Sequence, residues 1–242
     1  MSASFEYKGV NSLDMYMRIR NEIVFTSPEA DVDFIEVLGR DGELAIDNER
    51  LKGVPFSIPV TLKSPEDITI EQVASEISAW LKNDIGWYPL RFSGSPDYEY
   101  LAIYTEQFKV AETLKNYGKT VLTFKLKPYK RRIGNGSLNL TNGATLYNAE
   151  KRTSKPLITV EGQGDITFKK NGADWLVLTA VDGSITIDSE MMSVFKGTLP
   201  QFNKMNGNLS PMFPVLPPGE NTITWIGNAT KVTINPRWEA VV

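Results

Sequence analysis

Apolar residues in the first half of the chain follow two different spacings. Between residues 69 and 83 they recur every three or four positions, which predicts an α-helix with one apolar side. Thr69 is a suitable N-cap and Gln72 stands at the spacing of a capping box, while Asn83 and Gly86 provide the stop. The apolar side consists of Ile70, Val73, Ala74, Ile77, Trp80 and Leu81.

The other apolar runs of this half are short and rich in β-branched and aromatic residues, as β-strands are. They predict an antiparallel sheet with the single helix packed on it. The predicted strands are residues 22–25, 34–38, 55–62, 88–92, 100–104 and 120–126.

The second half alternates between strand-like runs and tight-turn sequences. Asn171-Gly172 and Asp182-Gly183 suit the positive φ angles of two-residue hairpin turns, so a meander is predicted. Pro218-Gly219 suits the central pair of a type II turn. Short strands at this spacing predict a β-sandwich. The predicted strands are residues 166–168, 175–179, 185–187, 221–226, 231–234 and 238–242.

Charge places the boundary between the halves. Residues 1–133 hold 17 Lys and Arg against 20 Asp and Glu, a net charge of −3, whereas residues 134–242 hold nine of each. Between them, a basic run over 125–132 passes Pro128 and ends in Gly134-Asn135-Gly136, as interdomain connections often do. We therefore expect domains at residues 1–133 and 134–242, divided near Ile133.

The composition argues against most enzyme chemistry. The 242 residues include no His and no Cys, so catalysis would depend on carboxylates, lysines or hydroxyls alone. The first residues do not resemble a signal peptide, and no stretch approaches the roughly 20 apolar residues that span a bilayer. We expect no enzyme activity, no catalytic residues, no metal, no cofactor and no membrane insertion.

Four stretches contain residues that could bind a ligand, but each has a simpler structural explanation. Gly134-Asn135-Gly136 precedes no helix pattern, so a hinge is favoured over a phosphate loop. The spaced carboxylates of Asp31-Val32-Asp33 and of residues 182–188 could hold Ca²⁺, but surface turns explain them better. The basic run with Tyr129 could contact nucleic acid, although the first half is acidic and a linker is favoured.

Aromatic residues between positions 98 and 108 fall at even spacing. Tyr98, Tyr100, Tyr104 and Phe108 would share one face of a continuous strand. The sequence does not distinguish whether such a face is buried, binds sugar or is covered by another subunit, although burial is the default interpretation.

The order of several short strings is similar to that in the distal tail proteins of siphophages. In the first half, the strings are residues 5–10 (FEYKGV), 38–42 (LGRDG), 77–81 (ISAWL), 97–102 (DYEYLA) and 127–129 (KPY). In the second half, they are residues 154–162 (SKPLITVEG), 187–190 (IDSE), 213–221 (FPVLPPGEN) and 236–238 (PRW). The resemblance covers nearly the whole chain.

The resemblance implies a structural virion protein. Members of that family form a hexameric ring at the end of a long non-contractile tail, around the DNA channel, and project a galectin-like β-sandwich outward. The expected partners are further copies of the chain, the tail tube protein, tail-tip proteins and receptor-binding proteins, with DNA only in transit. The expected location is the virion tail tip, after synthesis in the host cytoplasm.

The chain is too short for the carbohydrate-binding insertion that some members carry. The main alternative function is a carbohydrate-binding adhesion module, although galectin-type sugar sites generally use a histidine, which is absent here. A tail-associated hydrolase is a weaker alternative.

Two sets of residues are predicted to serve assembly. The hairpin around Tyr98 to Leu126 is expected to form the ring interface. The candidate interface residues are Tyr98, Tyr100, Tyr104, Phe108 and, just beyond the hairpin, Tyr129. A channel that DNA must traverse should not bind phosphates, so an acidic lining is expected. The candidates for that lining are Glu29, Asp31, Asp33 and Glu36.

Overall fold

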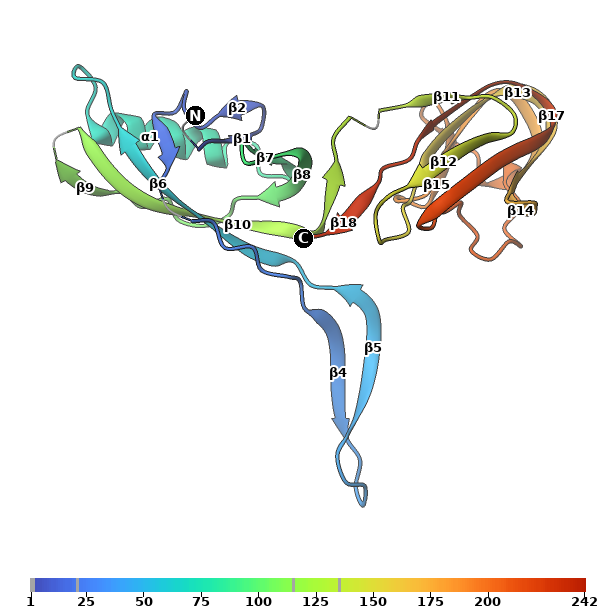
Figure 1. The fold of residues 1–242 in the computed structure, drawn as a ribbon, viewed down its shortest axis with the longest axis horizontal. Helices are drawn as coiled ribbons and strands as arrows, with labels where there is room; N and C mark the ends of the chain where they lie inside the picture. The colour runs from blue at the N-terminus through green and yellow to red at the C-terminus, as the bar shows by residue number, and fades with distance from the viewer. Residues whose placement is uncertain (1–2, 21, 115, 135) are drawn as a thin grey trace. The chain divides into compact units, whose positions relative to one another are not determined.

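The structure is a computed structural model and describes residues 3–20, 22–114, 116–134 and 136–242. The chain forms two compact units (Figure 1). Unit 1 comprises Met1–Lys130 together with Val241–Val242, and unit 2 comprises Arg131–Ala240. The division falls just before Ile133, and the return of the last two residues to unit 1 is a feature that the sequence did not predict.

Unit 1 is built on an antiparallel sheet that has nine strands among the described residues. The order is β2-β1-β7-β8-β10-β6-β3, and β9 and β18 also pair with β10. Its strands are β1 (Phe5–Tyr7), β2 (Val10–Asn11), β3 (Met17–Ile19), β6 (Val54–Lys63), β7 (Tyr88–Phe92), β8 (Ser95–Ile103), β9 (Ala111–Leu114), β10 (Tyr117–Arg132) and β18 (Glu239–Val241). The last two residues of β10 and the first two of β18 are assigned to unit 2.

The predicted helix is confirmed as α1 (Ile70–Lys82). The hydroxyl of Thr69 accepts a hydrogen bond from the backbone N–H of Gln72. The side-chain oxygen of Gln72 accepts a hydrogen bond from the backbone N–H of Thr69, so the capping box is complete. The four residues of α1 that are buried in unit 1 are Ile70, Val73, Ile77 and Leu81.

Strands β6 and β10 separate the core from an open face of the sheet. Alternate residues of β6, from Val54 to Leu62, are at most 2% exposed, and Leu122, Phe124 and Leu126 of β10 are buried with them. Burying each such side chain contributes about 1.5–3 kcal/mol. The residues between them point to the other face, because successive side chains alternate along a strand.

The region before β6 differs from the prediction. Residues 22–25 form no strand, and Phe25 is held instead by ring contacts with Phe56, Phe92 and Tyr100. The chain then forms a separate two-stranded hairpin from β4 (Ala30–Glu36) and β5 (Glu43–Leu51). Residues 34–38 were predicted as a strand, whereas β5 was missed because strands seldom contain Asp, Asn and Glu in succession.

Unit 2 is a second antiparallel sheet that curls around its own core (Figure 1). Its order among the described residues is β11-β17-β13-β14-β15-β16, with β12 also pairing with β17. The elements are β11 (Leu138–Leu140), β12 (Ala144–Asn148), β13 (Leu157–Lys170), β14 (Ala173–Asp188), β15 (Ser193–Lys196), β16 (Leu199–Pro200), the 3₁₀ turn η1 (Phe202–Lys204) and β17 (Gly219–Asn235).

Only one of the two hairpin turns predicted in this half exists. Asn171 and Gly172, with φ of 49° and 86°, join β13 to β14 as predicted. Asp182-Gly183 lies within β14, paired with Gln163 and Gly162, so the predicted turn is wrong there. The pairing of β13 with β14 shifts register just after Gly164, close to Gly183, and both strands bend there. The two halves of each bent strand then lie on different sides of the core.

The predicted mainly β class with one helix is confirmed. The predicted separate strands at 221–226 and 231–234 are one strand, β17, which bends in the same way at its register shifts with β13. The galectin likeness of unit 2 stays a prediction.

Candidate assembly surfaces

The β4–β5 hairpin is an arm of unit 1 that pairs with no other strand among the described residues (Figure 1). It exposes apolar side chains: Phe34 is 63% exposed and Leu38, at its tip, is fully exposed. A two-stranded hairpin by itself is at best marginally stable in water. The arm is therefore suited to be covered by another protein surface.

The strand register divides the arm into two faces. Phe34 is opposite Ala45 and Glu36 is opposite Glu43 on one face, which we call the Phe34 face. The other face carries Ile35 opposite Leu44 and Asp33 opposite Ile46. Carboxylates directly opposite each other repel, so Glu36 and Glu43 destabilise the free arm and favour a cationic partner.

The four residues predicted to line a channel all lie on or beside this arm, but not on one face. Asp31 is paired with Arg50 at 2.5 Å and with Lys52 at 3.7 Å, and the hydrogen bond from Arg50 lowers the pKa of its carboxyl group. Asp33 accepts a hydrogen bond from Asn48, and Glu36 points to the face opposite Asp33. Glu29 is exposed just before β4.

Two of the predicted interface residues are wrong. Tyr100 is 2% exposed and Tyr104 is 1% exposed, and both belong to the core of unit 1. Burial raises the pKa of Tyr104 to about 12. Strand β8 lies between β7 and β10, so its core-facing side chains cannot contact a second subunit.

The predicted hairpin from Tyr98 to Leu126 is accordingly the centre of a sheet and not an arm. Deleting this segment would remove core strands and prevent unit 1 from folding. Phe108 is half-buried against the same core, and the ammonium group of Lys130 lies 4.7 Å from the ring centre of Tyr98. An interface role for Tyr98, Phe108 and Tyr129 stays a prediction.

The open face of β3, β6 and β10 is cationic, and we call it the basic sheet face. The register places Arg18 beside Thr61 and Thr61 beside Lys119, and places Lys63 beside Tyr117. Lys125, further along β10, faces the same way. The described residues of this face are Arg18, Pro55, Ser57, Pro59, Thr61, Lys63, Tyr117, Lys119, Val121, Thr123 and Lys125, and none of them is acidic.

A hollow of about 360 Å³ lies at one end of the basic sheet face. Arg18 and Lys63 supply its charges, and Leu13, Tyr16 and Tyr117 supply apolar surface. The Lys63 ammonium lies 5.7 Å from the ring centre of Tyr117, and neither cation forms a salt bridge with a described carboxylate. The hollow combines aromatic surface with unpaired positive charge.

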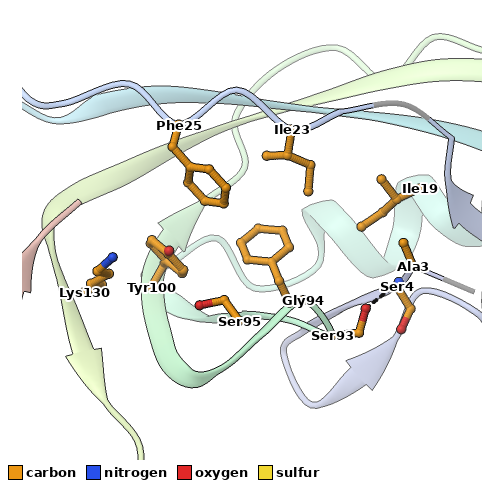
Figure 2. A pocket seen from close by; sticks show the side chains of 11 residues that line it. Ala3, Ser4, Ile19, Ile23, Phe25, Ser93, Gly94, Ser95, Tyr100 and Lys130 are labelled. Atoms are coloured by element: carbon orange, nitrogen blue, oxygen red, sulfur yellow. Dashed lines mark hydrogen bonds between the residues drawn. The ribbon is translucent and has the colours of Figure 1, made fainter. Parts of the chain in front are cut away.

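A second hollow, of about 410 Å³, lies where the chain passes from β3 toward the arm (Figure 2). Phe25, Ile23 and Ile19 line it together with Tyr100 and Lys130, and no described residue that lines it is a carboxylate.

A buried ion-pair network in unit 2 includes a carboxylate that the sequence suggested for a surface turn. Asp188 is 4% exposed and accepts hydrogen bonds from both terminal nitrogens of Arg237, at 2.7 and 2.9 Å. Its Oδ1 also accepts from the backbone N–H groups of Glu190 and Met191. These donors hold the pKa of Asp188 below its usual value despite burial, so the group is structural.

Neither metal sites nor membrane spans emerge from the described part of the chain. Its His, Cys, Asp and Glu residues form no group of three or more that could hold a metal ion. The one α-helix described, α1, is too short to cross a membrane.

Comparison with known proteins identifies the family. The model of the phage tail protein RIFT-related domain matches residues 6–142, which is more than half of the chain. No curated protein sequence matches significantly.

Two solved structures share the fold. The crystal structure of SPP1 Dit, described as a paradigm of the hub adsorption apparatus in phages that infect Gram-positive bacteria, is 14% identical with a TM-score of 0.70. That match covers 97% of this chain and 99% of Dit. A chain of the phage p2 baseplate in its activated conformation is 11% identical with a TM-score of 0.50, over 96% of both chains. The chain thus belongs to the phage tail proteins with a RIFT-related domain and has the fold of a siphophage distal tail protein.

Proposed function

We propose that this protein is the hub at the distal end of a long non-contractile phage or prophage tail. Six copies of unit 1 form a ring that joins the tail tube to the tip or baseplate and lets DNA pass. Unit 2 projects from the ring and attaches tip proteins or receptor-binding proteins. The protein acts as a structural virion component with no enzymatic step.

The observation that carries this proposal is the β4–β5 arm. In the single subunit it exposes Phe34, Ile35, Leu44 and Ile46 on its two strands and Leu38 in the turn between them, and these strands pair with no other strand in the described chain. A lone subunit is therefore incomplete, and assembly covers these side chains at a gain of about 25 cal/mol for each Å² of apolar surface buried. The proposal is also supported by the likeness of the whole chain to the fold of a distal tail protein.

The channel of such a ring must let DNA slide. Carboxylates that face the channel repel phosphates and prevent the counterion release that makes binding tight. Glu29 and Asp33 are the residues best suited to this lining, because Asp31 is already paired with cations and Glu36 faces away from Asp33.

The mass of the purified protein in solution, by light scattering with negative-stain imaging of any large species, tests the proposal. Six-fold rings are the expected result. A protein that stays monomeric at every concentration contradicts self-assembly. If such a monomer is retained on a panel of cell-wall glycans, the adhesion alternative replaces the hub.

A further inference from the structure

We infer that the Phe34 face of one subunit's arm docks on the basic sheet face of the next copy in the ring. The inference rests on the proposed hub function and names the two surfaces that close the ring. It is argued from charge, from apolar exposure and from the positions of the two surfaces in unit 1.

The two surfaces are complementary in charge. The arm from Ala30 to Leu51 carries seven carboxylates and two guanidinium groups, a net charge of −5. The basic sheet face carries four cations and, among its described residues, no acid. Opposed potentials of this kind orient two subunits before contact and exclude wrong pairings.

The two surfaces also match in apolar character. Phe34 is 63% exposed and stands beside the opposed pair Glu36 and Glu43. The hollow presents Tyr117, 39% exposed, between Arg18 and Lys63. An aromatic ring flanked by carboxylates thus meets an aromatic ring flanked by cations, and the repulsion between the two glutamates becomes an attraction to the neighbour.

The arm and the hollow of the basic sheet face lie at opposite ends of one strand, so they are separate patches that two successive copies can bring together. The arm leads into β6 at Val54, whereas the hollow lies at Lys63, where β6 ends. Ten residues of strand separate them by roughly 30 Å. Contact between different patches on successive copies is heterologous, and such contacts generate closed rings when the rotation between copies closes.

The inference assigns Glu36 to the contact between copies. Glu29 and Asp33 then remain for the channel. The contact should also weaken as sodium chloride rises from about 0.05 M to about 0.5 M, because exposed charge pairs are screened.

Matched charge reversals in the full chain test the contact. Arg18→Glu/Lys63→Glu reverses both charges of the hollow on the basic sheet face. Glu36→Lys/Glu43→Lys reverses the opposed pair on the Phe34 face and keeps like charges at these two positions, so the repulsion within the pair is unchanged. Either double variant should raise the concentration of half-assembly about a hundredfold, because like charges then face each other between copies.

The control is Lys151→Glu/Lys155→Glu, which makes the same charge change at exposed lysines of unit 2 and should assemble as the wild type does. An equimolar mixture of the sheet-face and arm variants should form rings again, since every arm in an alternating ring then meets a surface of opposite charge. Circular dichroism confirms that each variant is folded.

The outcomes separate this inference from the proposed function. Monomeric wild type overturns the proposed hub. Rings formed by the wild type and equally by both double variants overturn only the docking of the arm, as does a mixture that fails to recover. Binding of a short fluorescent DNA duplex by the wild type that is lost in Arg18→Glu/Lys63→Glu would assign the basic face to DNA instead.

Discussion

The substitution Asp188→Asn should destabilise unit 2 strongly, because it removes one half of a buried ion pair. Asp188 is 4% exposed, and its carboxylate accepts hydrogen bonds from both terminal nitrogens of Arg237. The side chain of Arg237 is 17% exposed. The amide of Asn can still accept the two backbone N–H groups, but it carries no charge and its nitrogen cannot accept from Arg237.

The contacts of Arg237 set the size of the expected loss in the free energy of unfolding. Leaving a buried charge without its partner costs about 3–5 kcal/mol. Glu190, 3.4 Å from Arg237, remains as a second carboxylate and compensates in part, so we expect a loss near the lower end, about 3 kcal/mol. For a unit of this size that corresponds to a fall of roughly 10–15 °C in melting temperature.

Calorimetry of the full chain measures the effect in the transition of unit 2. The control Asp182→Asn removes a carboxylate that is 77% exposed and 3.8 Å from Lys196, and should change the melting temperature by less than about 2 °C. A loss below about 1 kcal/mol in Asp188→Asn would refute the reasoning, because it would mean that solvent screens the pair.

The pH dependence supplies an independent check. The folded state lowers the pKa of Asp188, so the stabilisation from this group is fully present above its ordinary pKa and is lost as pH falls through the folded-state value. The difference between the wild type and Asp188→Asn should therefore be large at neutral pH and shrink in strong acid.

Three further variants test other parts of the fold. Thr69→Ala removes the capping box of α1 and should cost about 1 kcal/mol in urea unfolding of unit 1, whereas no loss would show that the cap is dispensable. Gly162→Ala should cost unit 2 about 1–3 kcal/mol by calorimetry, because the new Cβ would overlap the carbonyl oxygen of Asn228; Gly136→Ala, with open space around it, is the neutral control. Burial raises the pKa of Glu239, so as pH falls the folded state binds a proton at a higher pH than the unfolded state does. The stability of the wild type relative to Glu239→Gln, measured by thermal melts, should therefore increase as pH falls from 7. A stability difference that does not change with pH contradicts this.

Local patterns were enough to predict the elements whose own residues specify them. Helix α1 was predicted because its cap, its apolar spacing and its stop all lie within the segment. The Asn171-Gly172 turn was predicted for the same reason, since both residues supply the positive φ that the turn requires.

Other features depended on residues far apart in the chain. Gly183 has the φ of a turn residue, yet it lies within a strand because Gly162 pairs with it across the sheet. Tyr100 and Tyr104 have a spacing that would equally suit an exposed face, and they are buried because their side of the chain faces the core of unit 1. The same period describes a core strand and an interface strand, so a sequence pattern cannot distinguish them.

The sequence by itself determined the mainly β class, the single capped helix and the resemblance to siphophage tail proteins. Only the tertiary structure revealed that residues 30–51 leave the sheet as an acidic arm and that Arg18, Lys63 and Lys119 gather on one face. Those three cations come from strands far apart in sequence, and their charges combine only when β3, β6 and β10 pair side by side. Hydrogen bonding between distant segments therefore decided where the assembly surfaces lie.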